Sequence, residues 1–137
     1  MSEDRVIELK KALEDEPSSK AFLELARLLL DKDAKEAKQV LFQGLYYYPK
    51  NYVARLMLAK LFYKDGFYNF SAREIAEVWS ETKSETTKKL LLSFGEYGEH
   101  YFNKYSGQKA QSQAENVLAE IDLDSDISNA IIDFEQD

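Results

Sequence analysis

One apolar spacing recurs along the chain and limits what it can fold into. Large and small apolar residues fall at i, i+3, i+4 and i+7 in Phe22-x-x-Leu25-Ala26-x-x-Leu29. This spacing gathers apolar side chains on one face of an α-helix, whereas a half-buried strand alternates apolar and polar residues. Because only five Gly and two Pro interrupt the 137 residues, we predict an all-α chain.

The same spacing returns twice, which predicts a repeated unit. It recurs as Arg55-x-x-Leu58-Ala59-x-x-Phe62 and, more loosely, as Leu91-x-x-Phe94-Gly95-x-x-Gly98. A second apolar segment follows the first two: Ala37-x-x-x-Leu41-x-x-Gly44-Leu45, which ends at Pro49, and Ser71-x-x-x-Ile75-x-x-Val78-Trp79. Equivalent positions lie 32 residues apart for Pro17 and Pro49, 33 for Leu25 and Leu58, and 34 for Leu41 and Ile75. The predicted unit is a helical hairpin.

These residues stand at the positions of the tetratricopeptide (TPR) pattern, W-x2-L-G-x2-Y followed by A-x3-F and P. The chain resembles a small bacterial-type member of that family over residues 5–121, and VIELKKALEDEPSS is similar to the second helix of a preceding repeat. Lys83 stands where the second repeat would carry Pro. The resemblance implies a short α-solenoid of antiparallel helix hairpins, with about 2.5–3 repeats. An irregular helical bundle is the alternative.

Small and large residues have different expected roles in this packing. Ala26, Ala59 and Gly44 should let neighbouring backbones approach, and large apolar residues should fill the core: Leu25, Leu29, Leu41, Leu58, Phe62 and Ile75. Gly66 and Tyr68 are expected in the turn between the helices of the second repeat. Gly95 and Gly98 are expected inside a helix, where they permit close packing.

The chain is expected to divide at residue 121. Residues 1–121 should form the TPR-like domain, closed by a capping helix that carries Ala110, Ala114, Val117, Leu118 and Ile121. Residues 122–137 should form an acidic amphipathic tail, with Leu123, Ile127, Ala130, Ile131 and Phe134 at helical spacing. Three states of this tail stay open: a disordered, solvated end, a helix packed on the end of the stack, or a segment that occupies the protein's own groove or that of a neighbouring molecule. In the third state, deleting residues 122–137 should strengthen binding of an acidic ligand.

Charge is unevenly distributed along the chain. From residue 110 onward there are eight acids and no base, a net charge of −8, so that the total of −7 leaves +1 for the residues before it. Residues 34–73 carry seven bases and two acids, a net charge of +5. Nucleic acid is not the expected ligand, because so acidic a chain lacks the long-range attraction that dominates such binding.

Two further absences limit the compartment. There is no cysteine, so disulfides, thiolate metal sites and thiol nucleophiles are excluded. The first residues are acidic where a signal peptide would be basic, and no apolar run reaches the length of a membrane span. A cytoplasmic location without membrane contact is expected.

The TPR resemblance also implies a ligand site. In that family the first helix of each repeat lines a concave groove, and carrying its ligand-binding positions onto this chain selects Lys20, Leu23, Arg27, Leu30, Val53, Leu56, Lys60, Tyr63 and Lys64. Such a groove is apolar with a basic edge. It would suit a partner polypeptide with hydrophobic anchors and acidic flanks. The alternative is that the apolar residues are ordinary core and the bases ordinary solvated charges.

Aromatic residues support an interaction surface. Ten of them lie between residues 34 and 73, and Tyr46, Tyr47 and Tyr48 cannot all face one core. At least one should therefore be exposed, near Lys50 and Arg55. The expected function is that of an adaptor that binds a partner protein or peptide. A dedicated chaperone of a secreted or assembling client is the alternative, and a homodimer through the apolar ends of the stack is compatible with either.

Catalysis and metal binding find little support. His100, the one histidine, lies beside Glu99 and four residues after Glu96, but no third ligand or nucleophile can be named around it. Residues 122–133 partly imitate a calcium loop, yet Ile127 stands where the loop needs Gly. We expect no enzyme activity, no catalytic residue and no cofactor.

Overall fold

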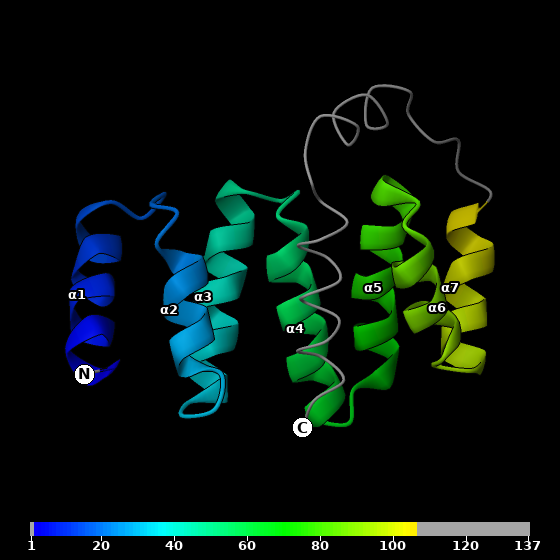
Figure 1. Ribbon diagram of the computed structural model, residues 1–137, viewed down its shortest axis with the longest axis horizontal. Helices are drawn as coiled ribbons and strands as arrows, with labels where there is room; N and C mark the ends of the chain where they lie inside the picture. Colours follow the sequence, from blue (N-terminus) through cyan, green and yellow to red (C-terminus); the bar gives the residue numbers. More distant parts are fainter. Residues whose placement is uncertain (1, 107–137) are drawn as a thin grey trace. The chain divides into compact units, whose positions relative to one another are not determined.

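The computed structural model describes residues 2–106, which form seven α-helices and no strand (Figure 1), so that the all-α prediction is confirmed for this part of the chain. The helices are α1 (Ser2–Asp15), α2 (Phe22–Leu29), α3 (Ala34–Tyr47), α4 (Tyr52–Lys64), α5 (Tyr68–Thr82), α6 (Glu85–Leu92) and α7 (Glu96–Ser106). They fall into two compact units, of which the first ends at Ala54 and the second begins at Arg55, within α4.

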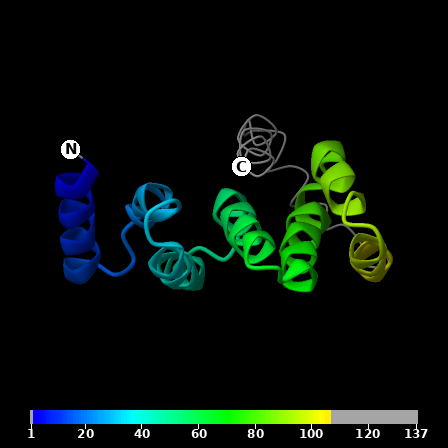
Figure 2. The ribbon, with the colours of Figure 1, turned by 90° about the horizontal axis from the view of Figure 1, so that it is seen from below.

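The first unit is built on the close pairing of α2 with α3, which lie side by side in both views (Figures 1 and 2). Phe22, Leu25 and Leu41 are fully buried there, as their spacing predicts. Gly44 faces Phe22 so closely that a Cβ at position 44 would collide with the phenyl ring. At Gly44 the space that a side chain would need is thus filled by the Phe22 ring, and not by the backbone of a neighbouring helix.

Helix α1 packs on α2 in the same unit. Arg5 makes a two-pronged ion pair with Glu24, with Nε–Oε2 and Nη2–Oε1 distances of 2.7 and 2.8 Å. This guanidinium holds the pKa of the Glu24 carboxyl below its usual value. Leu9 is the buried apolar residue of α1. Apolar burial at Leu9 and the exposed Arg5–Glu24 ion pair therefore hold α1 on α2.

The second unit is built around α5. Its Ser71 hydroxyl donates a hydrogen bond of 2.7 Å to the carbonyl of Ala59 in α4, and both residues are fully buried. The small residue at position 59 thus brings the backbone of α4 within reach of a short side chain on α5, as predicted for such positions. On its other sides α5 contacts α6 and α7.

Left-handed backbone conformations set the ends of two helices of this unit. Gly66, with φ of +84°, lies in the turn between α4 and α5, as predicted, whereas Tyr68 already begins α5. Helix α5 ends at Thr82. The next residue, Lys83, has a φ of +53°, and its N–H donates to the Trp79 carbonyl at 2.7 Å. A left-handed residue therefore terminates the helix at the position where the TPR pattern has Pro.

The third predicted segment is wrong in one respect. Residues 91–98 do not form one helical face, because α6 ends at Leu92 and Gly95 adopts a φ of +65° in the turn before α7. Gly98 fulfils its predicted role inside α7, since a Cβ there would collide with the carbonyl oxygen of Leu91. Phe62, predicted as core, is only half-buried.

Several predictions fall outside residues 2–106: the capping helix, the amphipathic tail and the calcium-like loop. Within the described helices, none combines the length and the apolar character that a membrane crossing requires.

Candidate protein-binding surfaces

An apolar pocket with a basic rim lies in the first unit. It has a volume of about 660 Å³ and is lined by Lys20, Leu23, Tyr47, Tyr48, Pro49, Lys50 and Asn51. We call it the Tyr48 pocket. Its size falls in the range of clefts that hold a ligand group or side chain, roughly 300–1,000 Å³.

The turn after α3 builds one wall of this pocket. Helix α3 ends before Pro49, and the N–H of Asn51 donates to the carbonyl of Tyr48 at 3.0 Å across the turn. Pro fixes the backbone at the second position of such a turn. The Asn51 side chain then accepts a hydrogen bond of 3.0 Å from the N–H of Ala54 and so caps α4. Lys50 is thereby held in an exposed position on the turn.

Tyr48 is locked in place as the floor of the pocket. Its hydroxyl donates to the carbonyl of Ser18 at 2.6 Å. Its ring stacks on Phe22, with centroids 6.0 Å apart and planes at 6°. Because Phe22 is itself part of the core against Gly44, the position of Tyr48 is fixed by the packing of α2 on α3.

The two lysines at the rim have no carboxylate partner among residues 2–106. Lys20 Nζ lies 5.7 Å from the centroid of the Tyr48 ring, a cation–π distance, and Lys50 is exposed. Two cations beside an apolar floor attract an anionic group that is joined to an apolar one. Tyr47, which lines the pocket, is 42% exposed, and its ring meets that of Tyr46, which is 80% exposed. The prediction of an exposed Tyr next to Lys50 is therefore confirmed.

The predicted groove residues are distributed over both units. In the first unit Lys20 and Leu23 meet in the Tyr48 pocket, while Arg27 is exposed on α2 and Leu30 and Val53 are half-buried; these three do not line the pocket. In the second unit Leu56 is buried, Lys60 is half-buried, and Tyr63 and Lys64 are exposed at the end of α4. The structure thus joins two of the nine predicted residues with a turn that the sequence patterns did not assign to the groove.

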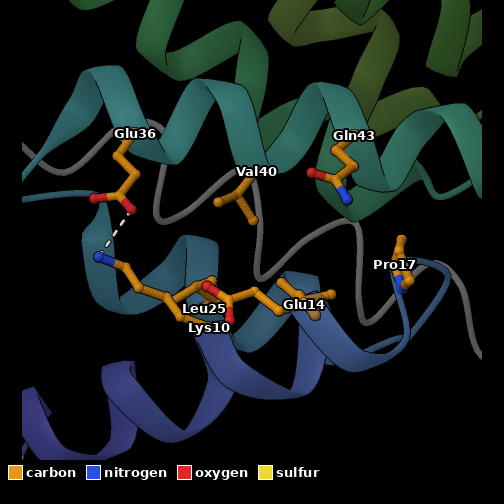
Figure 3. Close-up of a pocket in the computed structure, with 8 residues that line it drawn as sticks. Lys10, Glu14, Pro17, Leu25, Glu36, Val40 and Gln43 are labelled. Atoms are coloured by element: carbon orange, nitrogen blue, oxygen red, sulfur yellow. Dashed lines mark ion pairs between the residues drawn. The ribbon is translucent and has the colours of Figure 1, made fainter.

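A second pocket of the first unit is more polar. It has a volume of about 400 Å³ and lies among α1, α2 and α3, with Leu25, Val40, Leu13 and Pro17 beside Lys10, Glu14, Glu36 and Gln43 (Figure 3). Lys10 reaches across it to Glu36 with an Nζ–Oε1 distance of 2.9 Å. Because its cation is neutralised within the chain, this pocket offers less attraction to an anionic ligand than the Tyr48 pocket does.

The second unit carries an exposed aromatic cluster. Its rings come from the end of α4, the start of α5 and the turn into α7: Phe62, Tyr63, Phe67, Tyr68, Phe70, Phe94 and Tyr97. Their ring contacts form two groups. Phe70 meets Phe62 and Phe67, with centroids 5.7 and 6.1 Å apart. Tyr68 meets Tyr63 at 5.2 Å and Tyr97 at 6.4 Å, and Phe94 meets Tyr63 at 5.7 Å. Five of the seven rings are 42–51% exposed. Exposed aromatic side chains are enriched at protein-interaction sites.

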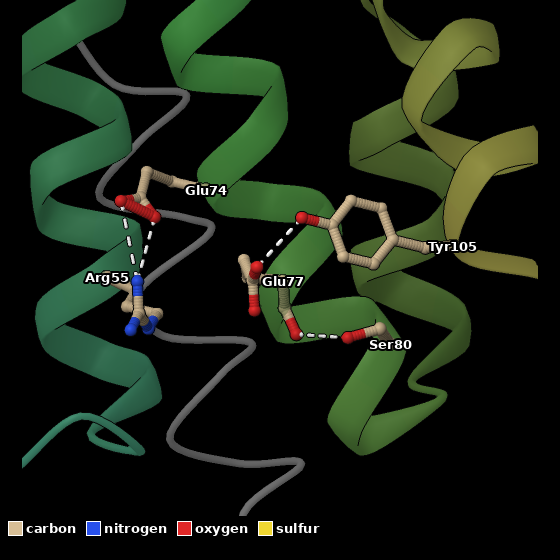
Figure 4. A network of polar contacts seen from close by, with 5 residues as sticks. All are labelled: Arg55, Glu74, Glu77, Ser80 and Tyr105. Atoms are coloured by element: carbon tan, nitrogen blue, oxygen red, sulfur yellow. Dashed lines mark hydrogen bonds and ion pairs between the residues drawn. The ribbon is translucent and has the colours of Figure 1, made fainter. Parts of the chain in front are cut away.

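Polar contacts fix the helices that carry the aromatic cluster. The hydroxyl of Tyr101 in α7 donates to Oδ1 of Asn69 in α5 at 2.9 Å. One helical turn further along α7, the Tyr105 hydroxyl donates to Glu77 at 2.7 Å (Figure 4). Both contacts hold α7 along α5, which places Tyr97 beside Tyr68.

The same network contains a buried ion pair. Arg55 of α4 lies 3.0 Å from Glu74 of α5, whose side chain is buried (Figure 4). Burial raises the pKa of the Glu74 carboxyl, although the guanidinium of Arg55 opposes that rise. Burial, together with the hydrogen bond to Glu77, also raises the pKa of Tyr105 to about 12. These groups are arranged for structure, since each charge meets a partner inside the chain.

The residues weighed for metal chemistry are not clustered. His100 is exposed on α7 and meets the ring of Tyr101 edge-on, at 4.8 Å between centroids. Residues 2–106 contain no group of three or more His, Asp or Glu side chains arranged to hold a metal ion.

No family model, curated protein or solved structure matches this chain.

Proposed function

We propose that this chain is a protein-interaction adaptor that binds a segment of a partner polypeptide. In this proposal the helices belong to a TPR-like array of antiparallel hairpins, and the Tyr48 pocket forms part of its ligand-binding face. The protein acts in the cytoplasm, without a cofactor. Its ligand is a segment that carries a hydrophobic side chain next to Asp or Glu.

The observation that carries the proposal is the composition of the Tyr48 pocket. Lys20 and Leu23, which the TPR pattern assigns to the groove, line it together with Tyr47, Tyr48 and Lys50. An apolar side chain of the ligand would displace water from the Leu23 and Tyr48 surface, which supplies affinity. The two rim lysines would orient an adjacent carboxylate and raise the association rate.

Selection from a random peptide library displayed on phage tests this function, because the protein itself then selects the ligand sequence. The enriched peptides should share an aromatic or aliphatic residue next to Asp or Glu, and their binding should weaken as salt rises. They should not be enriched on a Lys20→Glu, Lys50→Glu variant. Peptides that bind this variant as well as the wild type would show that the Tyr48 pocket is not the site.

A dedicated chaperone is the alternative function, and co-purification from the native cytoplasm separates the two. A chaperone should emerge with one stoichiometric client that is insoluble alone, whereas an adaptor should be stable by itself and bind folded partners. A Lys60→Glu, Lys64→Glu variant tested in parallel reports whether the predicted groove residues of α4 take part. Loss of one co-purifying protein would assign that surface to it.

A further inference from the structure

Helix α4 carries a stripe of apolar and basic side chains. Leu56, Lys60, Tyr63 and Lys64 stand at i, i+4, i+7 and i+8, a spacing that places them on one face of the helix. Leu56 is buried, Lys60 is half-buried, and Tyr63 and Lys64 are exposed. We call these four residues the α4 stripe.

The charge of α4 favours an acidic occupant for this stripe. Among the helices of residues 2–106, α4 alone contains no Asp or Glu, and it carries three bases. Arg55 is engaged by the buried carboxylate of Glu74, and the other two bases, Lys60 and Lys64, belong to the stripe. Asp65 is the next acid and lies in the turn after the helix. A segment with carboxylates beside apolar side chains is complementary to this arrangement.

The sequence of the chain itself contains such a segment. Residues 122–137, outside the described part of the structure, contain six acids and no base. A helix formed by them would have one apolar face, because apolar residues recur at i, i+4, i+7, i+8 and i+11: Leu123, Ile127, Ala130, Ile131 and Phe134. At about 100° per residue, acids would flank this face on both sides, with Asp126 and Asp133 on one side and Asp124 and Glu135 on the other.

The length of the connection allows this segment to reach the stripe. The ring of Phe94, just before α7, lies 5.7 Å from that of Tyr63 between centroids. Helix α7 has 11 residues and is roughly 16 Å long, so its last residue, Ser106, lies at most roughly 35 Å from Tyr63. The connecting residues 107–121 can span up to roughly 50 Å when extended.

The covalent connection also favours the same chain over a second copy. A short flexible linker gives an effective concentration in the millimolar range. A contact with a Kd of about 0.1 mM would then be about nine-tenths occupied within one molecule. Two separate copies at micromolar concentration would hardly associate through a contact of that strength.

We infer that residues 122–137 bind the α4 stripe of their own chain as an amphipathic helix. The apolar face of this helix packs against the Tyr63 ring, and its acids lie beside Lys60 and Lys64. The predicted groove residues of α4 thus serve a contact within the chain. The Tyr48 pocket contributes no residue to this contact.

A spin label tests this contact on the full-length chain. Because the sequence contains no cysteine, Asn129→Cys, on the polar side of the segment, can be labelled with a nitroxide at one position. The amide signals of residues 60–64 should then lose intensity and regain it when ascorbate reduces the label. Lys60→Glu, Lys64→Glu should abolish this loss, whereas the control Lys35→Glu, Lys89→Glu, with the same net charge and exposed positions, should retain it.

Two further arms complete the test. Ile131→Ser, Phe134→Ser should also abolish the intensity loss, and these changes lie outside the described core. In a mixture of isotope-labelled chains without nitroxide and unlabelled chains with it, the signals of residues 60–64 should keep their intensity. No partner is present in these samples, so their outcome is independent of the adaptor function.

Four results would overturn the inference. The first is an unchanged intensity at residues 60–64 in the spin-labelled chain. The second is an intensity loss that persists in Ile131→Ser, Phe134→Ser. The third is an equal reduction of the loss in both lysine variants, which would make it an effect of net charge. The fourth is a loss in the mixed sample as large as in the labelled chain, which would make a second copy the occupant.

Discussion

The ring of Phe22 occupies the space that a side chain on Gly44 would need. Gly44 lies on the buried face of α3, and Phe22 begins α2, so this contact sets how closely the two helices pair. The same phenyl ring stacks on Tyr48, the floor of the proposed ligand pocket. Helix packing and pocket geometry therefore depend on one residue without a side chain.

Replacement of Gly44 by Ala should destabilise the first unit by about 1–3 kcal/mol, as overpacking of a core does. This cost exceeds the gain in helix propensity of roughly 1 kcal/mol that Ala brings. Urea unfolding followed by circular dichroism measures the loss. Combining Gly44→Ala with Phe22→Leu should cost less than the two changes added together, because the smaller side chain leaves room for the new methyl group. Strictly additive losses would show that the two residues do not compete for the same space.

Replacement of Arg55, the partner of Glu74, should destabilise the fold more at neutral pH than in acid. Because burial raises the folded-state pKa of Glu74, its contribution to stability is greatest in acid and falls as pH rises through the raised pKa. Arg55→Met removes the guanidinium that lowers the pKa of Glu74. The remaining charges, Arg73 and Glu77, still lower and raise this pKa, respectively. The variant should therefore lose about 3 kcal/mol near neutral pH and clearly less in acid. Urea unfolding over a pH series gives this comparison, and a deficit independent of pH would contradict it.

Replacement of the buried Thr87 by Val should stabilise the protein. Its hydroxyl is fully buried and has no hydrogen-bond partner within residues 2–106. Val has nearly the same shape without the hydroxyl, so Thr87→Val should raise the free energy of unfolding by about 1 kcal/mol. Thr86→Val, at the exposed neighbouring position, is the matched control and should change stability by less than about 0.5 kcal/mol. A Thr87→Val variant less stable than the wild type would reveal a partner for the hydroxyl.

Ionisation of Tyr105 should lower the stability of the folded chain at alkaline pH. Its folded-state pKa is raised from 10.0 to about 12 by burial and by the hydrogen bond to Glu77. The folded chain thus favours the neutral phenol, and the stability that this group contributes is complete below pH 10 and is lost as pH rises toward about 12. Tyr105→Phe should cost about 1 kcal/mol at neutral pH for the lost hydrogen bond, and this difference should shrink at alkaline pH. Equal differences at both pH values would show that the phenol is not protected in the folded state.

Much of the helical framework could be predicted from the spacing of apolar residues. Helices α2 and α3 and the burial of Leu25 and Leu41 follow from that spacing. The break at Gly95 could not be predicted, because residues 91–98 keep helical spacing in sequence while Gly95 adopts a left-handed backbone. Periodicity reports which face of a helix is apolar, not where a glycine will end it.

The two surfaces were only partly predictable for a different reason. Lys20 and Leu23 of the Tyr48 pocket followed from the TPR pattern, and exposure near Tyr47 followed from the run of tyrosines. The cluster that joins Tyr68 to Tyr97 depends on how α6 and α7 return to α5, and no local signal in the sequence encodes such a long-range contact. The Tyr101 and Tyr105 hydrogen bonds that fix this return connect residues 32 and 28 positions apart.

The most direct test of the proposed function is a titration of one enriched, fluorescently labelled peptide against purified variants. The Lys20→Glu, Lys50→Glu variant should bind about tenfold or more weakly than the wild type. The control variant Lys35→Glu, Lys89→Glu has the same net charge and alters exposed positions outside the pocket, so it should bind as the wild type does. If both variants bound equally weakly, the loss of affinity would be an effect of net charge alone. If the pocket variant bound as tightly as the wild type, the Tyr48 pocket would not be the ligand site.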